Sequence, residues 1–314
     1  MKIKYRIESD TLGKKRINNL NLWGAQTQRS LENFRIGSEI MNKEVIVAFG
    51  NQKKAATLTN IMLGKIDKKI GKSIINACEE VINLKLINHF PLSIWQTGSG
   101  TQTNMNVNEV ISNYAIKQLK GEIGSKIPVH PNDHVNMSQS SNDTFPTVMN
   151  ISCNELIEKK LKNSLNEFVK ELKNKSNKFK NIIKIGRTHT QDATPVTLGQ
   201  EFSAFYQQMK NNQIRLMNMQ KELRYLAQGG TAVGTGINTK KNFDKKIVRE
   251  ISKYCKIPFK PAPNKFAEIA AHDAIVSFSG ALNSCAVALM KISNDIRFLG
   301  SGPRAGYGEL TLPE

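Results

Sequence analysis

A polar segment in the middle of the chain carries the densest set of side chains that could bind a substrate. Between Ile127 and Glu158 there is no lysine or arginine, although these two types make up 45 of the 314 residues. A solvated loop of such a basic protein would be expected to carry lysine. This segment instead contains hydroxyls, carboxamides, two histidines and two aspartates, which make hydrogen bonds with well-defined geometry. We interpret it as one wall of a binding site.

Ser140, Ser141 and Asn142 lie within this segment, directly before a pattern typical of a long helix. Backbone N–H groups at a helix N-terminus attract anions, and these side chains would add further donors there. Helix capping accounts for one or two of the polar residues of Ser138–Thr144. It does not account for all of them, so a binding role is the favoured interpretation.

A second polar segment, Trp95–Asn106, contains a glycine turn just before another predicted helix. Ser99, Gly100 and Thr101 would present backbone N–H groups and hydroxyls there, which is a suitable seat for a carboxylate. A plain Ser/Thr capping turn explains the segment equally well.

A third segment, Gly186–Pro195, joins two predicted long helices and contains the best candidate for acid–base chemistry. His189 is that candidate because only histidine titrates near neutral pH without a perturbed pKa. Thr188 beside it can hydrogen-bond a substrate carboxylate. A purely structural histidine fits this position as well. The glycine-rich segment Gln228–Asn238 follows a helix and lacks the glycine order of nucleotide loops, so we expect a turn that lines a cavity.

The elements that must position these segments are mostly helices. Apolar residues recur at spacings of three and four in three parts of the chain, which predicts helices with one apolar face. These residues are Ile157, Leu161, Leu165, Phe168, Val169 and Leu172; Leu198, Phe202, Phe205, Met209, Leu216, Leu223 and Leu226; and Phe266, Ile269, Phe278, Leu282, Cys285, Leu289, Ile292, Ile296 and Leu299. No glycine or proline interrupts residues 147–179 or 200–227, so two helices of about 30 residues, roughly 45 Å long, are predicted. One chain cannot easily bury every apolar face of such rods, so we expect copies to pack together.

Composition argues against several other classes of protein. No apolar run reaches the ~20 residues of a membrane span, and the N-terminus lacks the apolar segment of a signal peptide, so we expect a cytoplasmic protein without a membrane partner. The four cysteines stand far apart with no histidine at metal-ligand spacing, which indicates reduced thiols and no metal site. The net charge of +19 comes from 35 dispersed lysines and 10 arginines, without interleaved aromatics. That pattern favours a solvated surface over a nucleic-acid interface.

Taken together, the polar segments resemble the class II fumarases of the fumarase/aspartase superfamily. The resemblance rests on six motifs in the same order, namely Trp23–Ser30, Gly98–Asn104, His130–Asp133, Ser138–Asp143, Gly186–Asp192 and Ala227–Gly236. It implies a mainly all-α fold with a smaller N-terminal lyase domain (1–138) and a long central helical bundle (139–314). It also implies reversible hydration of fumarate to (S)-malate in the tricarboxylic acid cycle, with no metal and no organic cofactor. The implied assembly is a homotetramer whose active sites combine segments from three subunits.

The same likeness assigns roles to individual residues. The dicarboxylate substrate would be held by Ser99, Gly100, Thr101, Ser140, Ser141, Asn142 and Thr188. His189 matches the family's catalytic histidine, which handles the proton on the hydroxyl side. A second dicarboxylate site, called the B site in the family, would be formed by His130, Pro131, Asn132 and Asp133. Aspartase, the alternative within the superfamily, typically has glutamine at the position of His189, so the histidine favours water over ammonia as the added group.

The chain departs from the family pattern at its end. A flexible loop of the form Gly-Ser-Ser-x-x-Pro-x-Lys-x-Asn would be expected just after Leu312–Glu314, and it carries the family's carbon-acid base, a serine. That loop, the rest of the bundle and a small C-terminal domain are outside the sequence. Met137 is a lesser departure, because many relatives carry lysine there. Two hypotheses follow, a fragment of a full-length fumarase and an inactive remnant that at most assembles or binds dicarboxylates. The intact motifs favour the first, and we expect the 314-residue chain alone to be inactive.

Overall fold

The structure, a computed structural model, describes residues 4–314 of the chain, which divides into two compact units. Unit 1 comprises Met1–Glu155 and Leu223–His272. Unit 2 comprises Leu156–Glu222 and Asp273–Glu314. Each unit is therefore assembled from two separate stretches of the sequence.

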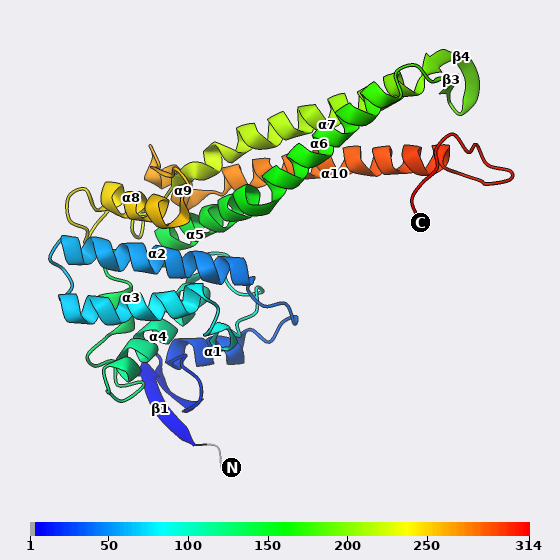
Figure 1. Ribbon diagram of the computed structural model, residues 1–314. Helices are drawn as coiled ribbons and strands as arrows, with labels where there is room; N and C mark the ends of the chain where they lie inside the picture. Colours follow the sequence, from blue (N-terminus) through cyan, green and yellow to red (C-terminus); the bar gives the residue numbers. More distant parts are fainter. Residues whose placement is uncertain (1–3) are drawn as a thin grey trace. The chain divides into compact units, whose positions relative to one another are not determined.

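Both units are built mainly from helices, which confirms the predicted fold class (Figure 1). The compact units do not follow the predicted division into residues 1–138 and 139–314, because unit 1 also takes in residues 139–155 and 223–272. That residues 1–138 and 139–314 form two separate domains stays a prediction.

The elements of unit 1 are short to medium in length. Its α-helices are α1 (Ala25–Asn33), α2 (Lys43–Met62), α3 (Lys68–Ile82), α4 (Thr101–Gln118), α5 (Ser141–Leu156, whose last residue opens unit 2), α8 (Phe243–Cys255) and α9 (Lys265–Ala270). Its strands are β1 (Tyr5–Asp10) with β2 (Gly13–Asn18), an antiparallel hairpin, and β5 (Tyr225–Leu226) with β6 (Lys260–Pro261), a parallel pair. Short helical turns lie at η1 (Ile87–His89), η2 (Pro131–Val135) and η4 (Glu222–Arg224, whose first residue closes a stretch of unit 2).

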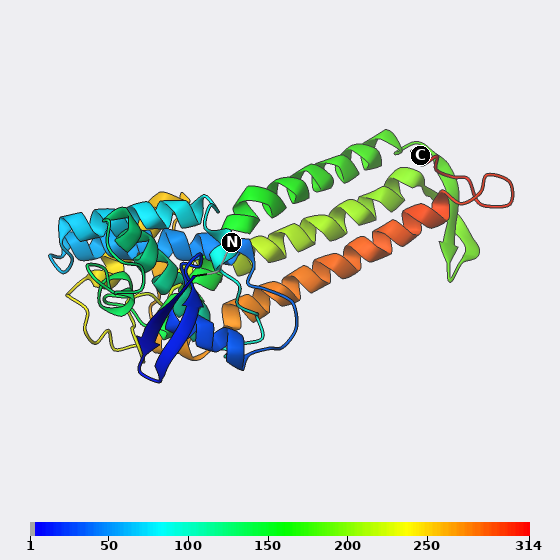
Figure 2. The same ribbon diagram turned by 90° about the horizontal axis from the view of Figure 1, so that it is seen from below.

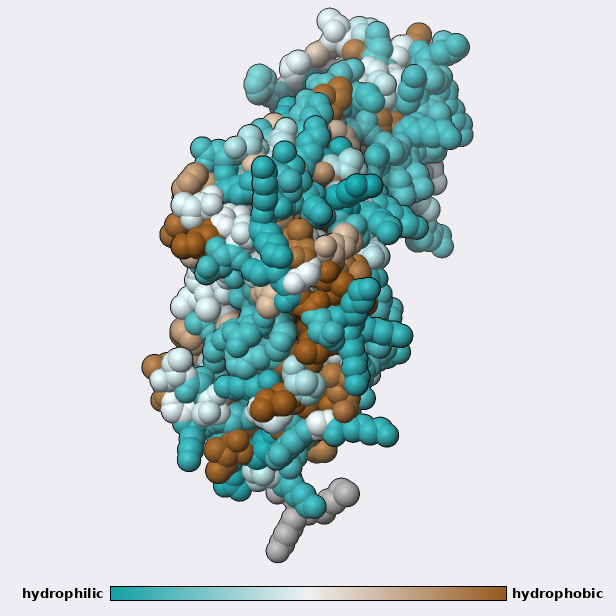
Figure 3. All heavy atoms as spheres, turned by 90° about the vertical axis from the view of Figure 1, so that its left-hand side faces the viewer, coloured by the Kyte–Doolittle hydropathy of each residue, from teal (hydrophilic) through white to brown (hydrophobic). Residues whose placement is uncertain are grey.

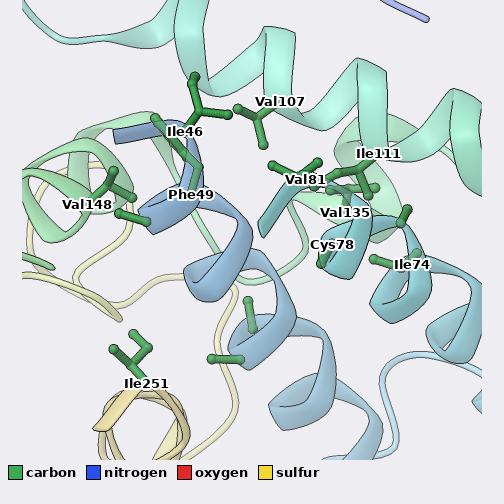
Figure 4. Packing of buried hydrophobic residues seen from close by; sticks show 14 of the residues in the cluster. Ile46, Phe49, Ile74, Cys78, Val81, Val107, Ile111, Val135, Val148 and Ile251 are labelled. Atoms are coloured by element: carbon green, nitrogen blue, oxygen red, sulfur yellow. The ribbon is translucent and has the colours of Figure 1, made fainter. Parts of the chain in front are cut away.

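One apolar core holds these helices together. It is lined by α2, α3, α4, α5 and α8, and α2 lies within it with residues buried on most of its sides. Figure 4 shows Ile46 of α2, Val81 of α3 and Val107 of α4 among these side chains, and each of them is at most 1% exposed. Burial of aliphatic side chains on this scale fixes the ends of α4 and α5, which matter for the site below.

Unit 2 consists of long helices and one hairpin. Its elements are η3 (Ile157–Leu161), α6 (Lys162–Lys178), β3 (Ile183–Thr188), β4 (Gln191–Thr197), α7 (Leu198–Gln220) and α10 (Asp273–Leu299). Helices α6, α7 and α10 run side by side, with α7 packed against both of the others (Figures 1 and 2). The first predicted long helix is present as α5, η3 and α6 in succession along the chain. The second was predicted too long, because α7 ends at Gln220 and is followed by η4 and β5. The segment between α6 and α7, expected to be a simple turn, is instead an antiparallel hairpin of β3 and β4.

Helix α10 presents much of its apolar surface to solvent within this single chain. Val276, Val287 and Met290 are 68%, 62% and 69% exposed, and no charged residue lies between Asp273 and Lys291. By length and composition alone α10 could cross a membrane, and the sequence analysis missed this because serine and asparagine interrupt the apolar run. A helix whose apolar face packs against another protein surface can have the same length and composition.

Hydrophilic atoms cover most of the face seen in Figure 3, and apolar atoms form smaller patches among them. This distribution is what a dispersed set of 35 lysines and 10 arginines would produce. Single apolar side chains on such a surface are normal.

The polar segment Trp23–Ser30 is held by a buried carboxylate from another helix. Glu109 of α4 accepts hydrogen bonds from the backbone N–H groups of Gly24 (2.8 Å), Gln26 (2.9 Å) and Thr27 (3.1 Å), and from the Thr27 hydroxyl (2.6 Å). These are the free N–H groups at the start of α1, so Glu109 caps that helix from outside. Burial raises the pKa of Glu109, and the hydrogen bonds oppose that rise.

This arrangement predicts a cost for any side chain at Gly24. A Cβ atom there would lie 2.7 Å from the carboxylates of both Glu109 and Glu8. We expect Gly24→Ala to lower the free energy of unfolding by roughly 1–3 kcal/mol, the usual cost of overpacking. Gly98→Ala is the matched control, because a Cβ at Gly98 has no atom within 4 Å. Urea unfolding of both variants checks the prediction, and equal midpoints would contradict it.

Candidate active site

The carboxylate of Asp143 organises the start of α5. It is fully buried, and its Oδ1 accepts the Ser140 N–H at 2.9 Å. Its Oδ2 accepts the N–H groups of Gly229 and Thr231, each at 2.9 Å, and the Gln228 side-chain amide at 3.1 Å. Burial raises the pKa of Asp143 to about 6, although these donors favour its charged form. One side chain thus joins the polar segment before α5 to the glycine-rich segment after β5.

A buried lysine supports the same polar segment from behind. Lys53 of α2 is fully buried, and its Nζ donates to Asn136 Oδ1 at 2.9 Å and to Gln139 Oε1 at 3.0 Å. Gln52 beside it donates to Gln139 Oε1 at 2.9 Å and to Gln228 Oε1 at 2.7 Å. Burial lowers the pKa of Lys53 to about 7. The interior of unit 1 therefore fixes the backbone of Asn136–Ser140 through side-chain amides.

The structure brings two of the predicted binding segments together. Asn104 of α4 donates from Nδ2 to Ser141 Oγ at 2.9 Å, which links the first turns of α4 and α5. Gly100 has a left-handed backbone (φ 65°), and a Cβ there would lie 2.2 Å from the ring of Phe145. Only glycine allows this close approach. The N-termini of α4 and α5, with the segments Ser99–Thr101 and Ser140–Asn142, consequently meet in unit 1.

Neutral hydrogen-bonding groups line the meeting point of these two helix ends. Ser99 and Asn142 are exposed, while Thr101, Ser140 and Ser141 are half-buried. The Ser99 and Thr101 hydroxyls lie 3.1 Å apart, and Asn142 Nδ2 donates to the Ala232 carbonyl at 2.8 Å. Two helix N-termini with added hydroxyls make a local positive potential without a cationic side chain. A carboxylate is the ligand that suits such a place.

Sequence reasoning did not assign roles to Gln52, Lys53, Asn104 or Asp143. Asn104 and Asp143 stand inside quoted motifs, and their positions at the first turns of helices could have signalled them. Lys53 gives a weaker signal, because it is one of two adjacent lysines in the middle of a helix that is mostly buried. What makes these four residues important is contact between distant segments, which periodicity does not reveal.

The predicted second dicarboxylate site forms a helical turn of its own. His130 precedes the π-helical turn η2, and its Nδ1 accepts the N–H groups of Asn132 (3.2 Å) and Asp133 (3.1 Å). Asp133 Oδ2 lies 3.3 Å from the same nitrogen, but an Nδ1 that accepts two N–H groups carries no proton, so we do not treat this contact as an ion pair. Burial lowers the pKa of His130. Pro131 is buried, whereas Asn132 and Asp133 are exposed, and ligand binding here stays a prediction.

Thr188 and His189 belong to unit 2. They stand at the tip of the hairpin, where Thr188 pairs with Gln191 and both are exposed. His189 and Thr190 form the two-residue connection, and both have a left-handed backbone (φ 50° and 63°). Such turns favour Asn-Gly, so histidine and threonine here are conformationally strained. The catalytic role of His189 stays a prediction.

Within residues 4–314 no three histidine, cysteine, aspartate or glutamate side chains gather in a way that could hold a metal ion.

The sequence and the helical fold match a known class of enzymes. A model of the lyase family matches residues 13–314. The mitochondrial fumarate hydratase of Rhizopus oryzae is 58% identical over 313 residues, which is 99% of this chain and 63% of that protein. The class II fumarate hydratase of Caulobacter vibrioides is 57% identical over 309 residues, covering 98% of this chain and 67% of that protein.

A solved structure agrees with these relatives. The class II fumarase of Schistosoma mansoni superposes with a TM-score of 0.93 at 43% sequence identity, over 96% of this chain and 67% of that one. The chain belongs to the lyase family and, within it, to the class II fumarate hydratases. It spans about two thirds of the length of these relatives, 63% in the case of the Rhizopus protein.

The buried Lys53 predicts a pH dependence of stability. Its folded pKa of about 7 lies below the usual lysine pKa of 10.5, so between these pH values the unfolded chain binds more protons. The free energy of unfolding should therefore rise with pH from about pH 7, by at most ~1.4 kcal/mol per unit from this one group. Lys53→Met removes this contribution. Between pH 7 and pH 9, we expect the free energy of unfolding of wild type to rise by about 1–2 kcal/mol relative to that of Lys53→Met.

Urea unfolding at several pH values measures this difference. Lys72→Met, at an exposed position of α3, is the control and should run parallel to wild type. The prediction is wrong if the free energy of unfolding of Lys53→Met also changes with pH in the same way as that of wild type.

Proposed function

We propose that the protein catalyses the reversible hydration of fumarate to (S)-malate. The observation that carries the proposal is the meeting of Ser99–Thr101 with Ser140–Asn142 at two helix N-termini, linked by Asn104 and Ser141 at 2.9 Å. The likeness to fumarate hydratases over almost the whole chain supports the choice of reaction. Because the chain spans 63% of the length of the Rhizopus relative, the activity is proposed for the product of the complete gene.

The proposed role of the two helix ends is to bind a carboxylate whose charge grows during the reaction. Loss of a proton from the carbon beside a carboxylate moves electron density onto that carboxylate. Donors already aimed at it stabilise the transition state without having to reorganise. The contacts of Asp143, Lys53 and Gln52 supply the rigidity, because they fix the backbone that carries the donors.

His189 is proposed to exchange the proton on the hydroxyl side of the substrate, and Thr188 to hold the second carboxylate. Two features support this role. Histidine is the side chain best suited to proton transfer near neutral pH. The imidazole is also exposed at the hairpin tip, where a ligand can reach it.

The proposed assembly is a homotetramer in which the hairpin of one copy completes the unit 1 site of another. The exposed apolar face of α10 supports association, since Val276, Val287 and Met290 would otherwise remain in water. The division of the candidate residues between the two units supports shared sites. We place the reaction in the tricarboxylic acid cycle and the protein in the cytoplasm.

Turnover by the purified product of the complete gene tests the proposed reaction. Fumarate should be consumed and malate formed, and His189→Asn should lower kcat by roughly 10²–10⁴-fold, the usual contribution of a general acid or base. His272→Asn, at another exposed histidine, should leave kcat unchanged. The proposal fails if wild type does not hydrate fumarate, or if His189→Asn is as active as wild type.

Mixing two inactive variants tests whether copies share sites. Asn142→Ala alters unit 1 and His189→Asn alters unit 2, so a hybrid tetramer should regain some sites in which both residues are intact. Random assortment of the two chains restores about a quarter of the sites if these residues come from different copies. A mixture of Thr188→Ala with His189→Asn, both in the hairpin, should stay inactive. Absence of recovery in the first mixture would contradict shared sites.

A further inference from the structure

The hairpin that carries Thr188 and His189 has little packing of its own. None of the residues of β3 or β4 is buried. One side borders a cleft of about 1290 Å³ lined by Lys184, Arg187 and Thr190 among others. An isolated two-stranded hairpin is marginally stable in water, and the strained turn at its tip lowers its stability further. Something else must hold it in place.

Glu309 provides two charged contacts to β3. Its Oε1 accepts a hydrogen bond from Arg187 at 2.5 Å, and its Oε2 lies 2.6 Å from Lys184 Nζ. Lys184 Nζ also donates a hydrogen bond to Glu201 Oε2 at 2.6 Å. The three side chains are 9–18% exposed, so solvent screens them only partly. Burial would raise the pKa of Glu309, yet these two cations hold it below its usual value.

The backbone around Glu309 is anchored to the end of α10. The Glu309 N–H donates to the Leu299 carbonyl at 2.9 Å, and the Gly308 N–H donates to the Ser301 carbonyl at 2.8 Å. The ring of Tyr307 lies 4.2 Å below the guanidinium of Arg187 and packs on Phe298 of α10. The segment of residues 300–310 is thus a closed loop that presents Glu309 to β3.

A bulge in the hairpin allows both cations to reach this one carboxylate. Lys184 and Arg187 are three residues apart, and a regular strand would direct them to opposite faces. The pairing register shifts between Ile185 and Arg187, and the added twist at such a bulge turns both side chains toward Glu309. Gly186 lies at the shift, where a Cβ would be 2.6 Å from the Thr194 carbonyl.

We propose that Glu309 is a positioning residue that clamps the hairpin to the end of α10 and thereby sets the position of the Thr188–His189 turn. The catalytic part of this proposal rests on the proposed function, whereas the clamp itself does not. Arg187 lies next to Thr188, so loss of its partner would be transmitted directly to the turn. Glu201 is 30% exposed and contacts Lys184, whereas Glu309 contacts both Lys184 and Arg187, so removing the charge of Glu201 leaves the contact of Arg187 in place.

Two readouts on the product of the complete gene test the clamp. In Glu309→Gln, hydrogen–deuterium exchange of the amides of residues 183–197 should accelerate at least tenfold, because the substitution keeps the shape and removes the charge. The value of kcat should fall at least tenfold, and more than KM rises. Glu201→Gln is the matched control and should leave both readouts near wild type. Glu309→Asp, which keeps the charge on a shorter arm, should give an intermediate result.

Unchanged exchange of residues 183–197 in Glu309→Gln would overturn the proposal, as would equal effects of Glu309→Gln and Glu201→Gln. If Glu309→Gln does not fold, Glu309→Asp decides in its place. Exchange of residues 183–197 should then be at least threefold faster than in wild type, and exchange at the wild-type rate would contradict the clamp. If wild type shows no hydration of fumarate, the proposed function fails while the exchange measurement still decides the clamp.

Discussion

The buried carboxylate of Asp143 is the interaction on which the candidate site depends. It accepts four hydrogen bonds from two segments, residues 140 and 228–231, that lie far apart in the sequence. A buried charge without such partners would be strongly unfavourable, so the two segments can adopt this arrangement only together. The direction of the first turn of α5 follows from that contact, and so does the position of Ser140–Asn142.

In the candidate site, lysine and arginine side chains lie away from the surface that would face a ligand. The wall of the site has no lysine or arginine along the chain, yet Lys53 of α2 lies directly behind it and binds Asn136 and Gln139. Its N–H groups fix side-chain amides inside the protein. The surface that faces a ligand is left with hydroxyls, carboxamides and helix N-termini, whose donors are fixed in direction and do not titrate near neutral pH. Such donors suit the binding of a carboxylate at constant geometry.

The sequence was informative wherever a property is local. The long helices α6 and α7 follow from apolar spacing and the absence of glycine and proline, and the motifs around Ser99 and Ser140 were found by their polarity. The hairpins β1–β2 and β3–β4 were missed because their pairing depends on contacts across turns that carry no Asn-Gly signal. Lys53, Glu109 and Glu309 were missed for a related reason. Each acts on a distant segment, and a single charged residue in one sequence does not name its partner.

Equilibrium binding of succinate, an unreactive dicarboxylate, to the product of the complete gene tests the central claim most directly. Asp143→Asn and Glu109→Gln each neutralise a buried carboxylate that accepts backbone N–H groups in unit 1. Only Asp143 contacts the Ser140–Asn142 segment, while Glu109 caps α1. The account predicts that Asp143→Asn weakens succinate binding more than tenfold and that Glu109→Gln keeps it within about twofold of wild type. Equal affinities of the two variants for succinate would contradict it.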